Sequence, residues 1–521
     1  MSNDRGGRAA TVVGAGILLS RITGLLRNFL VARYFGMGLE TEAFNTASRI
    51  PNIMRNLLGE GALSASFVPV YTRLLEKDKR AANALANSIL GLLMSAVSLL
   101  TLVGIAGAPA LTTILAGGFS GEKRELTIQL TQILFPMTAL MVLSGWCLGI
   151  QNSHRRFFWS YASAAMWNVA QIVFLLWQGP HASILRELAV GLAWATLVGS
   201  ILQVAAQLPE ILKLVRPLRF SLNRDAPGVA DTLKNLVPVL TALGVVQISS
   251  LIDVQIASHL PGSPITSLNN ANAVILLPVA LFGVSIAASS LPEFSRDSGK
   301  LDHNALVERL RTGWQRVLFY IVPSTIACIV FGDLIVGMLY RTGRFTAGDE
   351  HVVHSVLAGF AVGLISYGSV KLLASAHYAL KDYRTPMRAS IASLAVSAVI
   401  SIGLAILLRN SVYAAAGIAL GTAIGSYVNL SVQIKGLRSK LGPLYTHRMW
   451  LGTRRIIIST IVAAAVAAPV RYLVWGKAPF IAGPPTLGLF SLTYLVVAWQ
   501  MGSSEAARWL RQSARAESVS P

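Results

Sequence analysis

Two long apolar stretches near the amino terminus contain arginine at positions where a membrane-spanning helix normally has no charge. Arg21, Arg27 and Arg55 lie within segments 9–35 and 43–70, whose other residues are mostly apolar. At about 1.5 Å of rise per residue, Arg21 lies roughly 18 Å into its helix, close to the middle of a bilayer about 30 Å thick. A cation there costs several kcal/mol unless it faces water, an anion or another polar group. The pattern therefore predicts a wet cavity that holds something negative.

Helical spacing gathers the polar residues of these two segments into stripes. Ser20 and Arg27 share one face of the first helix, with Arg21 about 100° away, and Asn52 and Arg55 share one face of the second. Both segments contain arginine and no lysine. The planar guanidinium donates two parallel hydrogen bonds to a phosphate, which a lysine ammonium cannot do. We expect Arg21, Arg27 and Arg55 to bind a phosphate-type group in a cavity that Ser20 and Asn52 help to line.

Acidic residues offer a structural alternative for some of these charges. Arg33 and Arg49 lie near expected helix ends, where snorkelling or pairing with a carboxylate explains them. Glu42 and Glu60 are candidates to position the cavity arginines or to gate closure by pairing with them. Asp253 lies inside a later apolar segment and is a functional candidate for that reason, the alternative being a polar tie to a neighbouring helix.

The composition is that of an integral membrane protein. Of 521 residues, 54% are hydrophobic and 13% are charged, against about 25% charged in soluble domains. The net charge of +21 comes from basic residues in short loops, above all those that follow the even-numbered apolar segments. This positive-inside pattern argues against a nucleic-acid-binding face and predicts a multi-pass protein with both termini in the cytoplasm.

The apolar segments predict an all-α protein with about 14 transmembrane helices. They lie at 9–35, 43–70, 84–108, 126–150, 158–178, 187–209, 235–260, 267–294, 314–339, 352–378, 388–408, 412–434, 453–475 and 485–502. FVPVYTR at 67–73 resembles SLPEFSR at 290–296, so that Arg73 matches Arg296. Because this match joins the second and eighth segments, it predicts two lobes in parallel repeat.

The predicted organisation has four parts. They are an N-terminal lobe at 1–210, a cytoplasmic linker at 211–234, a C-terminal lobe at 235–436, and two additional helices with a cytoplasmic tail at 437–521. The loop at 209–230 is basic with interspersed Leu, Val and Phe. It is expected either to lie on the anionic cytoplasmic membrane surface or to act as a solvated linker.

Signals for catalysis and for bound cofactors are missing from the sequence. It contains no GxxxxGK[ST] motif, no HExxH motif and no paired His and Cys ligands, and Cys147 and Cys328 each lie alone in apolar surroundings. We therefore expect a transporter rather than an enzyme, without cofactor or metal, and without direct use of ATP.

Several motifs resemble the MurJ (MviN) family of lipid II flippases. They are SRITGLLRNFLVARYFG at 20–36, EAFNTASRIPNIMRNLLGEGALSASFVPVY at 42–71, RTGRFTAGD at 341–349 and ALKDYRTP at 379–386. The resemblance implies the fold of the multidrug/oligosaccharidyl-lipid/polysaccharide exporter superfamily and alternating access. It also implies an undecaprenyl-diphosphate-linked disaccharide-pentapeptide (lipid II) as substrate, moved from the inner to the outer leaflet. The family's cavity arginines map onto Arg21, Arg27 and Arg55, and its acidic positions onto Glu42 and Glu60.

The sequence departs from the family pattern in the eighth segment and in the first. The family's eighth helix usually carries an arginine and a nearby glutamate, where this chain has Ala273 and Leu276 in ANAVILLP. The first helix has Asn28 where an aspartate commonly follows the arginine. The loss of both an Arg and a Glu from the eighth helix is consistent with a compensated loss of a charge pair, with a relative that moves another lipid-linked glycan, or with a degenerate relative.

The resulting interpretation is a bacterial inner-membrane flippase that supplies lipid II for cell-wall synthesis and cell shape. Its expected partners are lipid II, membrane lipids and the cell-wall synthesis machinery, with no nucleic acid. The alternatives are a flippase for another lipid-linked oligosaccharide and a membrane enzyme that uses the same lipid. A multidrug exporter fits less well, because cationic drugs need carboxylates rather than arginines.

Overall fold

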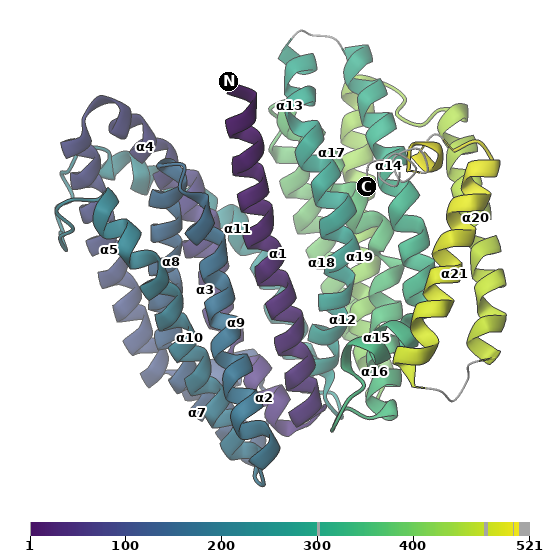
Figure 1. Cartoon of the computed structure of the whole chain (residues 1–521), viewed down its shortest axis with the longest axis horizontal. Coiled ribbons are helices and arrows are strands. Elements are labelled where there is room, and N and C mark those ends of the chain that lie inside the picture. The colour runs from purple at the N-terminus through teal and green to yellow at the C-terminus, as the bar shows by residue number, and fades with distance from the viewer. Residues whose placement is uncertain (1, 300–302, 474–477, 504, 510–521) are drawn as a thin grey trace, which may run out of the picture. The chain divides into compact units, whose positions relative to one another are not determined.

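The computed structural model describes residues 2–299, 303–473, 478–503 and 505–509, and within these ranges its regular secondary structure is all helical, with no strand. The predicted all-α fold is therefore confirmed. The chain divides into two compact units (Figure 1). Unit 1 comprises Met1–His259 and Thr342–Phe345, and unit 2 comprises Leu260–Arg341 and Thr346–Pro521.

Unit 1 contains the first eleven α-helices, a π-helix and a short 3-10 helix. They are α1 (Ser2–Phe35), α2 (Leu39–Ala47), α3 (Arg49–Met54), η1 (Arg55–Ala62), α4 (Leu63–Lys77), α5 (Lys79–Ala106), α6 (Ala108–Leu115), α7 (Gly121–Leu134), α8 (Pro136–Ser153), α9 (Phe157–Gln178), η2 (Gly179–His181), α10 (Leu185–Leu214) and α11 (Val229–Ser258).

Unit 2 contains the remaining ten α-helices and a second π-helix. They are α12 (Pro264–Pro278), η3 (Val279–Val284), α13 (Ser285–Gly299), α14 (His303–Val330), α15 (Gly332–Tyr340), α16 (Ala347–Val362), α17 (Leu364–Ala379), α18 (Arg384–Leu407), α19 (Ala414–Leu441), α20 (His447–Leu473) and α21 (Pro479–Gln500).

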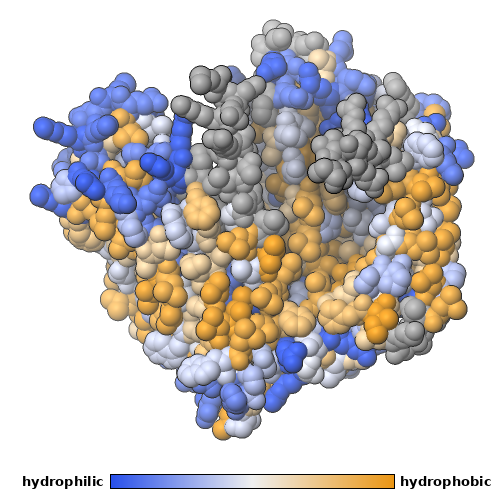
Figure 2. Space-filling view, in the orientation of Figure 1, coloured by the Kyte–Doolittle hydropathy of each residue, from blue (hydrophilic) through white to orange (hydrophobic). Residues whose placement is uncertain are grey.

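Many of these helices are long and apolar enough to cross a bilayer. Nine helical segments of the described chain meet that description, and the pair α16–α17, bent by 42°, makes a tenth when it counts as one span. Helices α1, α9 and α11 are 34, 22 and 30 residues long, which is also sufficient length. Figure 2 shows apolar side chains along the middle of the helices and hydrophilic ones toward their ends. The chain is a multi-pass membrane protein, and the total of 14 spans stays a prediction.

The two π-helices fall at matching places in the internal repeat. The register that pairs Arg73 with Arg296 places η1 (55–62) onto 278–285, a range that contains η3. Single π-turns inside α-helices are rare and occur often at functional sites. The repeat thus extends beyond the short sequence match to a shared break in helix geometry.

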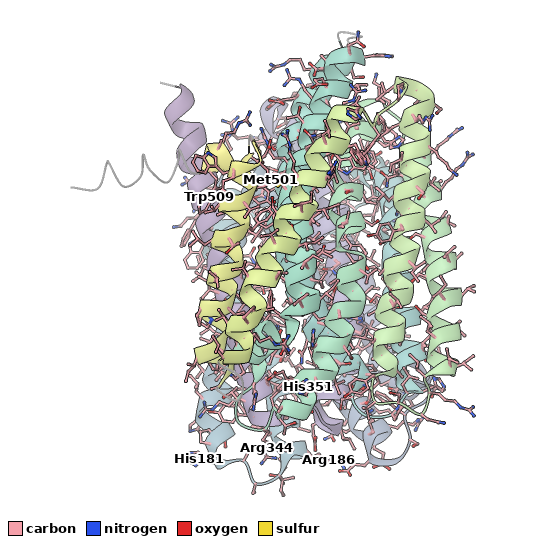
Figure 3. The ribbon with its side chains drawn as sticks, turned by 90° about the vertical axis from the view of Figure 1, so that its right-hand side faces the viewer. His181, Arg186, Arg344, His351, Met501 and Trp509 are labelled. Atoms are coloured by element: carbon pink, nitrogen blue, oxygen red, sulfur yellow. The ribbon has the colours of Figure 1, made fainter. Side chains whose placement is uncertain are left out.

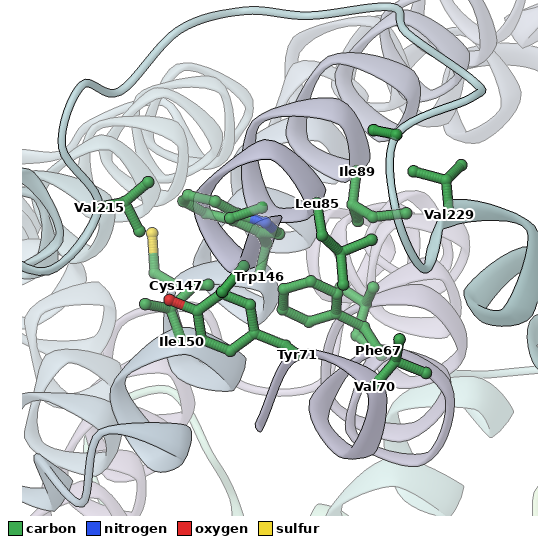
Figure 4. Close-up of a cluster of buried hydrophobic side chains, with 14 of the residues drawn as sticks. Phe67, Val70, Tyr71, Leu85, Ile89, Trp146, Cys147, Ile150, Val215 and Val229 are labelled. Atoms are coloured by element: carbon green, nitrogen blue, oxygen red, sulfur yellow. The ribbon is translucent and has the colours of Figure 1, made fainter. Parts of the chain in front are cut away.

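The core of unit 1 is built from aromatic and branched side chains of α4, α5 and α8. Phe67, Tyr71, Leu85 and Trp146 are almost completely buried there (Figure 4), and the Phe67 and Tyr71 rings stack with centroids 5.2 Å apart. Tyr71 also places its hydroxyl 3.0 Å from His154 Nε2 at the end of α8. This core holds α4, α5 and α8, which follow Arg55 in the chain, against one another.

Helices α20 and α21 are joined to the rest of unit 2 by polar contacts as well as by apolar packing. Arg471 on α20 donates to Asp333 Oδ2 at 2.7 Å and to the Val330 carbonyl oxygen at 2.6 Å, and the Tyr494 hydroxyl on α21 donates to the Phe319 carbonyl oxygen at 2.6 Å. Figure 3 shows His351 at one end of unit 2 and Met501 and Trp509 at the other.

Two segments pack differently from the predicted division into lobes. Helix α11, which we expected to begin the C-terminal lobe, packs against α4 and η1 and belongs to unit 1. The segment Thr342–Phe345 also belongs to unit 1, where the Arg344 backbone nitrogen donates to the Arg33 carbonyl oxygen at 2.9 Å. The predicted lobe boundaries stay a prediction about functional halves, whereas the packed unit ends at His259.

Candidate functional site

The contact between α1 and α9 in unit 1 is organised by one buried amide. Asn168 on α9 is 4% exposed, and its amide nitrogen donates to the Ser20 carbonyl oxygen at 3.3 Å and to Thr23 Oγ1 at 3.1 Å. Its amide oxygen accepts from Arg27 Nη1 at 3.2 Å. Ser20, Thr23 and Arg27 are three and four residues apart and therefore fall on one helix face. A single side chain on α9 thus contacts three residues of one face of α1, two of which, Ser20 and Arg27, belong to the predicted polar stripe.

Arg27 is oriented by several neighbouring side chains. Its Nε and Nη2 donate to Asn28 Oδ1 at 3.2 and 2.8 Å, and its Cζ lies 4.7 Å from the centroid of the Trp167 ring. A guanidinium over an indole face gains about 0.5–2 kcal/mol, depending on how far it is desolvated. Asn28, Asn168 and Trp167 fix the direction of the guanidinium and carry no charge of their own. That arrangement suits an arginine that receives an anionic ligand.

Arg55 shares the same indole. Its Cζ lies 5.9 Å from the centroid of the Trp167 ring, and it is the first residue of the π-helix η1. Trp167 therefore brings together arginines from two different helices, α1 and η1. We call Arg27, Arg55, Trp167 and Asn168 the arginine–indole cluster. Two of the three predicted phosphate ligands belong to it.

The third predicted ligand, Arg21, is exposed on α1, next to the exposed side chains of Ile22 and Leu26. The cluster's described contacts come from Arg27 and Arg55 and do not reach it. Ser20 joins the cluster through its backbone carbonyl oxygen, and Asn52 is half-buried on α3, one turn before Arg55. Roles for Arg21 and Asn52 in ligand binding stay predictions.

The acidic candidates lie in other parts of unit 1. Glu42 is completely buried on α2, and its Oε2 lies 3.4 Å from Lys123 Nζ on α7, which itself lies 4.1 Å from the Phe119 ring centroid. Pairing of Glu42 with the cavity arginines thus stays a prediction, and the Glu60 side chain lies outside the described residues.

Asp253 on α11 is close enough to Arg49 on α3 for their opposite charges to attract each other. Both residues are half-buried, and α11 packs against η1, which continues directly from α3. An attraction of this kind partly offsets the cost of placing either charge in a spanning helix. It supports the structural alternative for both residues, that of a tie between neighbouring helices.

Sequence reasoning missed Trp167 and Asn168. They stand together in the segment 158–178, which we treated only as an apolar span. An amide and an indole within such a span are polar groups that need partners, and this was the available signal. The partner itself is not visible in the sequence, because Asn168 and Arg27 are 141 residues apart.

Two positions of the eighth apolar segment differ from the family pattern in unit 2. Ala273 is half-buried and Leu276 is 46% exposed on α12, so the positions where the family usually has Arg and Glu carry apolar side chains. In the part of the chain that the structure describes, no group of three or more His, Cys, Asp or Glu residues is arranged to hold a metal ion. Cys147 and Cys328 are free and buried.

Comparison with known proteins gives a consistent result. The family model described as lipid II flippase MurJ matches residues 31–481. The lipid II flippase MurJ of Burkholderia cenocepacia is 32% identical over 471 residues, which cover 88% of each chain. Among solved structures, a lipid II flippase MurJ in an inward closed conformation matches with a TM-score of 0.79 at 23% identity, covering 94% of this chain and 98% of that one.

A second solved structure widens the fold comparison. It is a multidrug resistance MATE family transporter of the MOP superfamily in an inward-facing conformation, with a TM-score of 0.68 at 15% identity. The match covers 84% of this chain and 98% of that chain. At this level of identity both structural matches establish the fold alone.

Proposed function

Because the chain belongs to the lipid II flippase MurJ family, we propose that it moves lipid II from the inner to the outer leaflet of the bacterial inner membrane. It would do so by alternating access, with both termini in the cytoplasm, and would supply the machinery that polymerises the cell wall. The chain would act as a transporter and not as an enzyme.

The arginine–indole cluster is the observation that carries this proposal. A polyprenyl diphosphate presents several anionic oxygens, and two guanidiniums over one indole offer several donors in fixed directions. Asn168 and Asn28 orient Arg27 through their amide oxygens, which accept hydrogen bonds from its guanidinium. Arg55 is the first residue of the π-helix η1. The irregular backbone of such a helix would allow its side chain to shift as the ligand moves.

The test is complementation of a bacterial strain depleted of its own lipid II flippase. We expect the wild-type chain to restore growth and to restore the accessibility of lipid II at the outer leaflet, normalised to the amount of protein in the membrane. Growth without recovery of lipid II accessibility would contradict the proposal, and so would failure of both when the protein is present at normal levels.

A flippase for another lipid-linked oligosaccharide is the second candidate. Ala273, Leu276 and Asn28 depart from the family pattern at positions that we expect to line the transport pathway. The cluster does not separate the two candidates, since any polyprenyl-diphosphate glycan carries the same anion. Transport assays in vesicles with lipid II and with a lipid of the same diphosphate but a different glycan separate them directly.

A further inference from the structure

The segment 215–224 after α10, which we call the linker strap, is fixed to unit 1 at both ends. Val215 at its start and Val229 beyond its end are completely buried in the core of unit 1, as Figure 4 shows. Leu218 packs against the same core, and Ala226 is 6% exposed. The strap is therefore a docked element rather than a free solvated linker.

Side chains of α5 hold the middle of the strap by its backbone. Asn83 Nδ2 donates to the Arg216 carbonyl oxygen and Asn87 Nδ2 to the Pro217 carbonyl oxygen, both at 2.9 Å. The Arg219 backbone nitrogen in turn donates to Asn87 Oδ1 at 3.0 Å. Gly91 on α5 also lies directly under the Ser221 backbone, where a Cβ would collide with it. One face of the strap is consequently occupied by α5, and the other is presented outward.

The outward face combines large apolar side chains with cations. Phe220 is 62% exposed and Leu222 is 56% exposed, in an element whose backbone is already fixed. The basic side chains on the strap and just before it are also exposed, namely Lys213, Arg216, Arg219 and Arg224. The apolar surface continues onto α10, a candidate membrane span, where Leu208 and Leu212 are 40% and 48% exposed.

We propose that the linker strap is a binding surface for the anionic phospholipids of the cytoplasmic leaflet, with Phe220 and Leu222 inserted among the headgroups. The proposal rests on the predicted cytoplasmic placement of the strap and is independent of the transported lipid. The charge of the strap is complementary to that of the leaflet, because basic side chains close to an anionic membrane surface are attracted to it. The location matches as well, because the strap begins where the lipid-exposed helix α10 ends, and two exposed apolar side chains gain by leaving water there.

The insertion test uses the full-length chain in nanodiscs of phosphatidylcholine, alone or mixed with phosphatidylglycerol. An environment-sensitive fluorophore is attached to Phe220→Cys or, as the matched control on the same loop, to Asp225→Cys, whose side chain is exposed. The native Cys147 and Cys328 are buried, so the label is directed to the new cysteine. Lipid-borne and aqueous neutral quenchers then report the surroundings of each site.

We expect the label at Phe220 to be quenched from the lipid, more strongly when phosphatidylglycerol is present, and the label at Asp225 to be quenched from water. Equal aqueous quenching at both sites would overturn the proposal. Lipid quenching of equal strength with and without phosphatidylglycerol would also overturn the proposal, because the cations would then have no role. A Phe220 label shielded from both quenchers would overturn it too, because protein would then cover the strap.

A charge test complements the insertion test. The double variant Arg219→Gln with Arg224→Gln removes two strap cations, and Lys77→Gln with Arg80→Gln removes two other exposed cations of unit 1. We expect the strap variant to lose about tenfold in its preference for phosphatidylglycerol, measured by the lipids that remain bound in native mass spectrometry. The control is expected to keep its preference. If both variants lost the same preference for phosphatidylglycerol, the preference would depend only on the overall charge of the protein. That result would contradict a specific binding surface on the strap.

Discussion

The contact between α9 and α10 in unit 1 and the contact between α18 and α19 in unit 2 have the same construction. The register that pairs Gly199 with Gly425 also pairs Trp167 with Ser393. A Cβ on Gly199 would lie 2.8 Å from the Trp167 carbonyl oxygen, and one on Gly425 would lie 2.7 Å from the Ser393 carbonyl oxygen. In both units a glycine lets the later helix approach the backbone of the earlier one, and the residues approached, Trp167 and Ser393, are equivalent positions of the repeat.

The side chain at that residue is what differs. In unit 1 it is the indole that supports Arg27 and Arg55, and in unit 2 it is a serine. The register of the sequence match likewise pairs Arg55 with Pro278, which directly precedes the second π-helix. The repeated packing thus exists without the cluster. We therefore propose that the cluster is an addition to the scaffold and that its residues serve ligand binding more than folding.

The ends of α8 and α17 show the same division between shared geometry and different chemistry. Arg155 and Lys381, which correspond in the register of the two glycines, both have φ of 57°. Beside the first turn, Gln151 Nε2 donates to Glu210 Oε2 at 3.3 Å. Beside the second, His377 Nδ1 lies 3.0 Å from Asp382 Oδ2, which also accepts from Lys440 Nζ at 2.6 Å.

The largest expected effect comes from the cluster's arginines. Arg27→Ala and Arg55→Ala each remove charge-assisted hydrogen bonds to the diphosphate, worth about 1.5–3 kcal/mol, or roughly 10- to 100-fold in binding. Lysine keeps the charge but loses the planar fork, so Arg→Lys is expected to be partly defective. The measurement is lipid II accessibility at the outer leaflet, normalised to protein level.

The control for these variants is Arg33→Ala. Arg33 is exposed near the end of α1 and is expected to tolerate alanine. Arg21→Ala is informative as well, because the sequence predicts a severe defect whereas the side chain is exposed. Full activity in the Arg27 and Arg55 variants would show that the cluster is dispensable for transport and that unit 1 does not differ from unit 2 in this respect.

The next effect tests the shared scaffold. Gly199→Ala and Gly425→Ala each force a Cβ against a backbone oxygen, and overpacking of this kind costs about 1–3 kcal/mol of stability. We expect both variants to lower the melting temperature of the detergent-solubilised protein by similar amounts. Gly403→Ala on α18 is the control, because a Cβ there meets nothing within 4 Å. A loss in one unit only would show that the two contacts are not equivalent.

A smaller effect is expected from Trp167→Leu. It keeps an apolar side chain at the glycine contact and removes the indole under the two guanidiniums, at a cost of about 0.5–1 kcal/mol for such a contact. Lipid II transport, normalised to the amount of protein in the membrane, should fall about two- to fivefold. Ser393→Leu, the equivalent change in unit 2, should leave transport unaltered. Equal losses of transport in both variants would remove the distinction between the units.

The smallest effect concerns acid stability at the end of α17. Burial alone would raise the pKa of the Asp382 carboxyl, but hydrogen bonds from Lys440, Thr385 and His377 hold the pKa well below its usual range. The unfolded carboxyl titrates near pH 4, so this stabilisation is complete above that pH and is lost as the pH falls toward the lower folded pKa.

Asp382→Asn should therefore lower the melting temperature at pH 7 and flatten its decline below about pH 4, the ordinary pKa of the acid. The matched control is Asp225→Asn, which alters an exposed carboxylate on the loop after α10 and should leave the profile unchanged. If Asp382→Asn and the wild type show parallel melting profiles across this range, the bonds to Asp382 contribute nothing to stability.

The sequence was sufficient for the helical class, the multi-pass character and two of the cluster's residues. A lone charge in an apolar helix is a local signal, so Arg27 and Arg55 were visible without knowledge of the fold. It was harder to predict from the sequence which of these arginine side chains contacts the rest of unit 1. Arg21 and Arg27 differ by helix rotation, and only the packing of α9 on α1 decides between them.

The remaining features depend on long-range contacts that one sequence does not reveal. Trp167 and Asn168 acquire their role from α1, and Asn87 acquires its role from a strap 130 residues later. Helix α11 was expected to begin the second lobe because apolar segments give the order of the spans along the chain and not the helices against which each span packs. In each case the residue type shows that a partner is needed, and the three-dimensional arrangement supplies its identity.

Binding of undecaprenyl diphosphate to the purified full-length chain shows whether Arg27 and Arg55 in unit 1 form the anion site. Native mass spectrometry of the wild type, of the double variant Arg27→Ala with Arg55→Ala, and of Arg33→Ala gives the comparison. We predict that the double variant loses at least about 10- to 100-fold in affinity while Arg33→Ala keeps wild-type affinity. Unchanged affinity in a folded double variant would show that Arg27 and Arg55 do not bind the diphosphate.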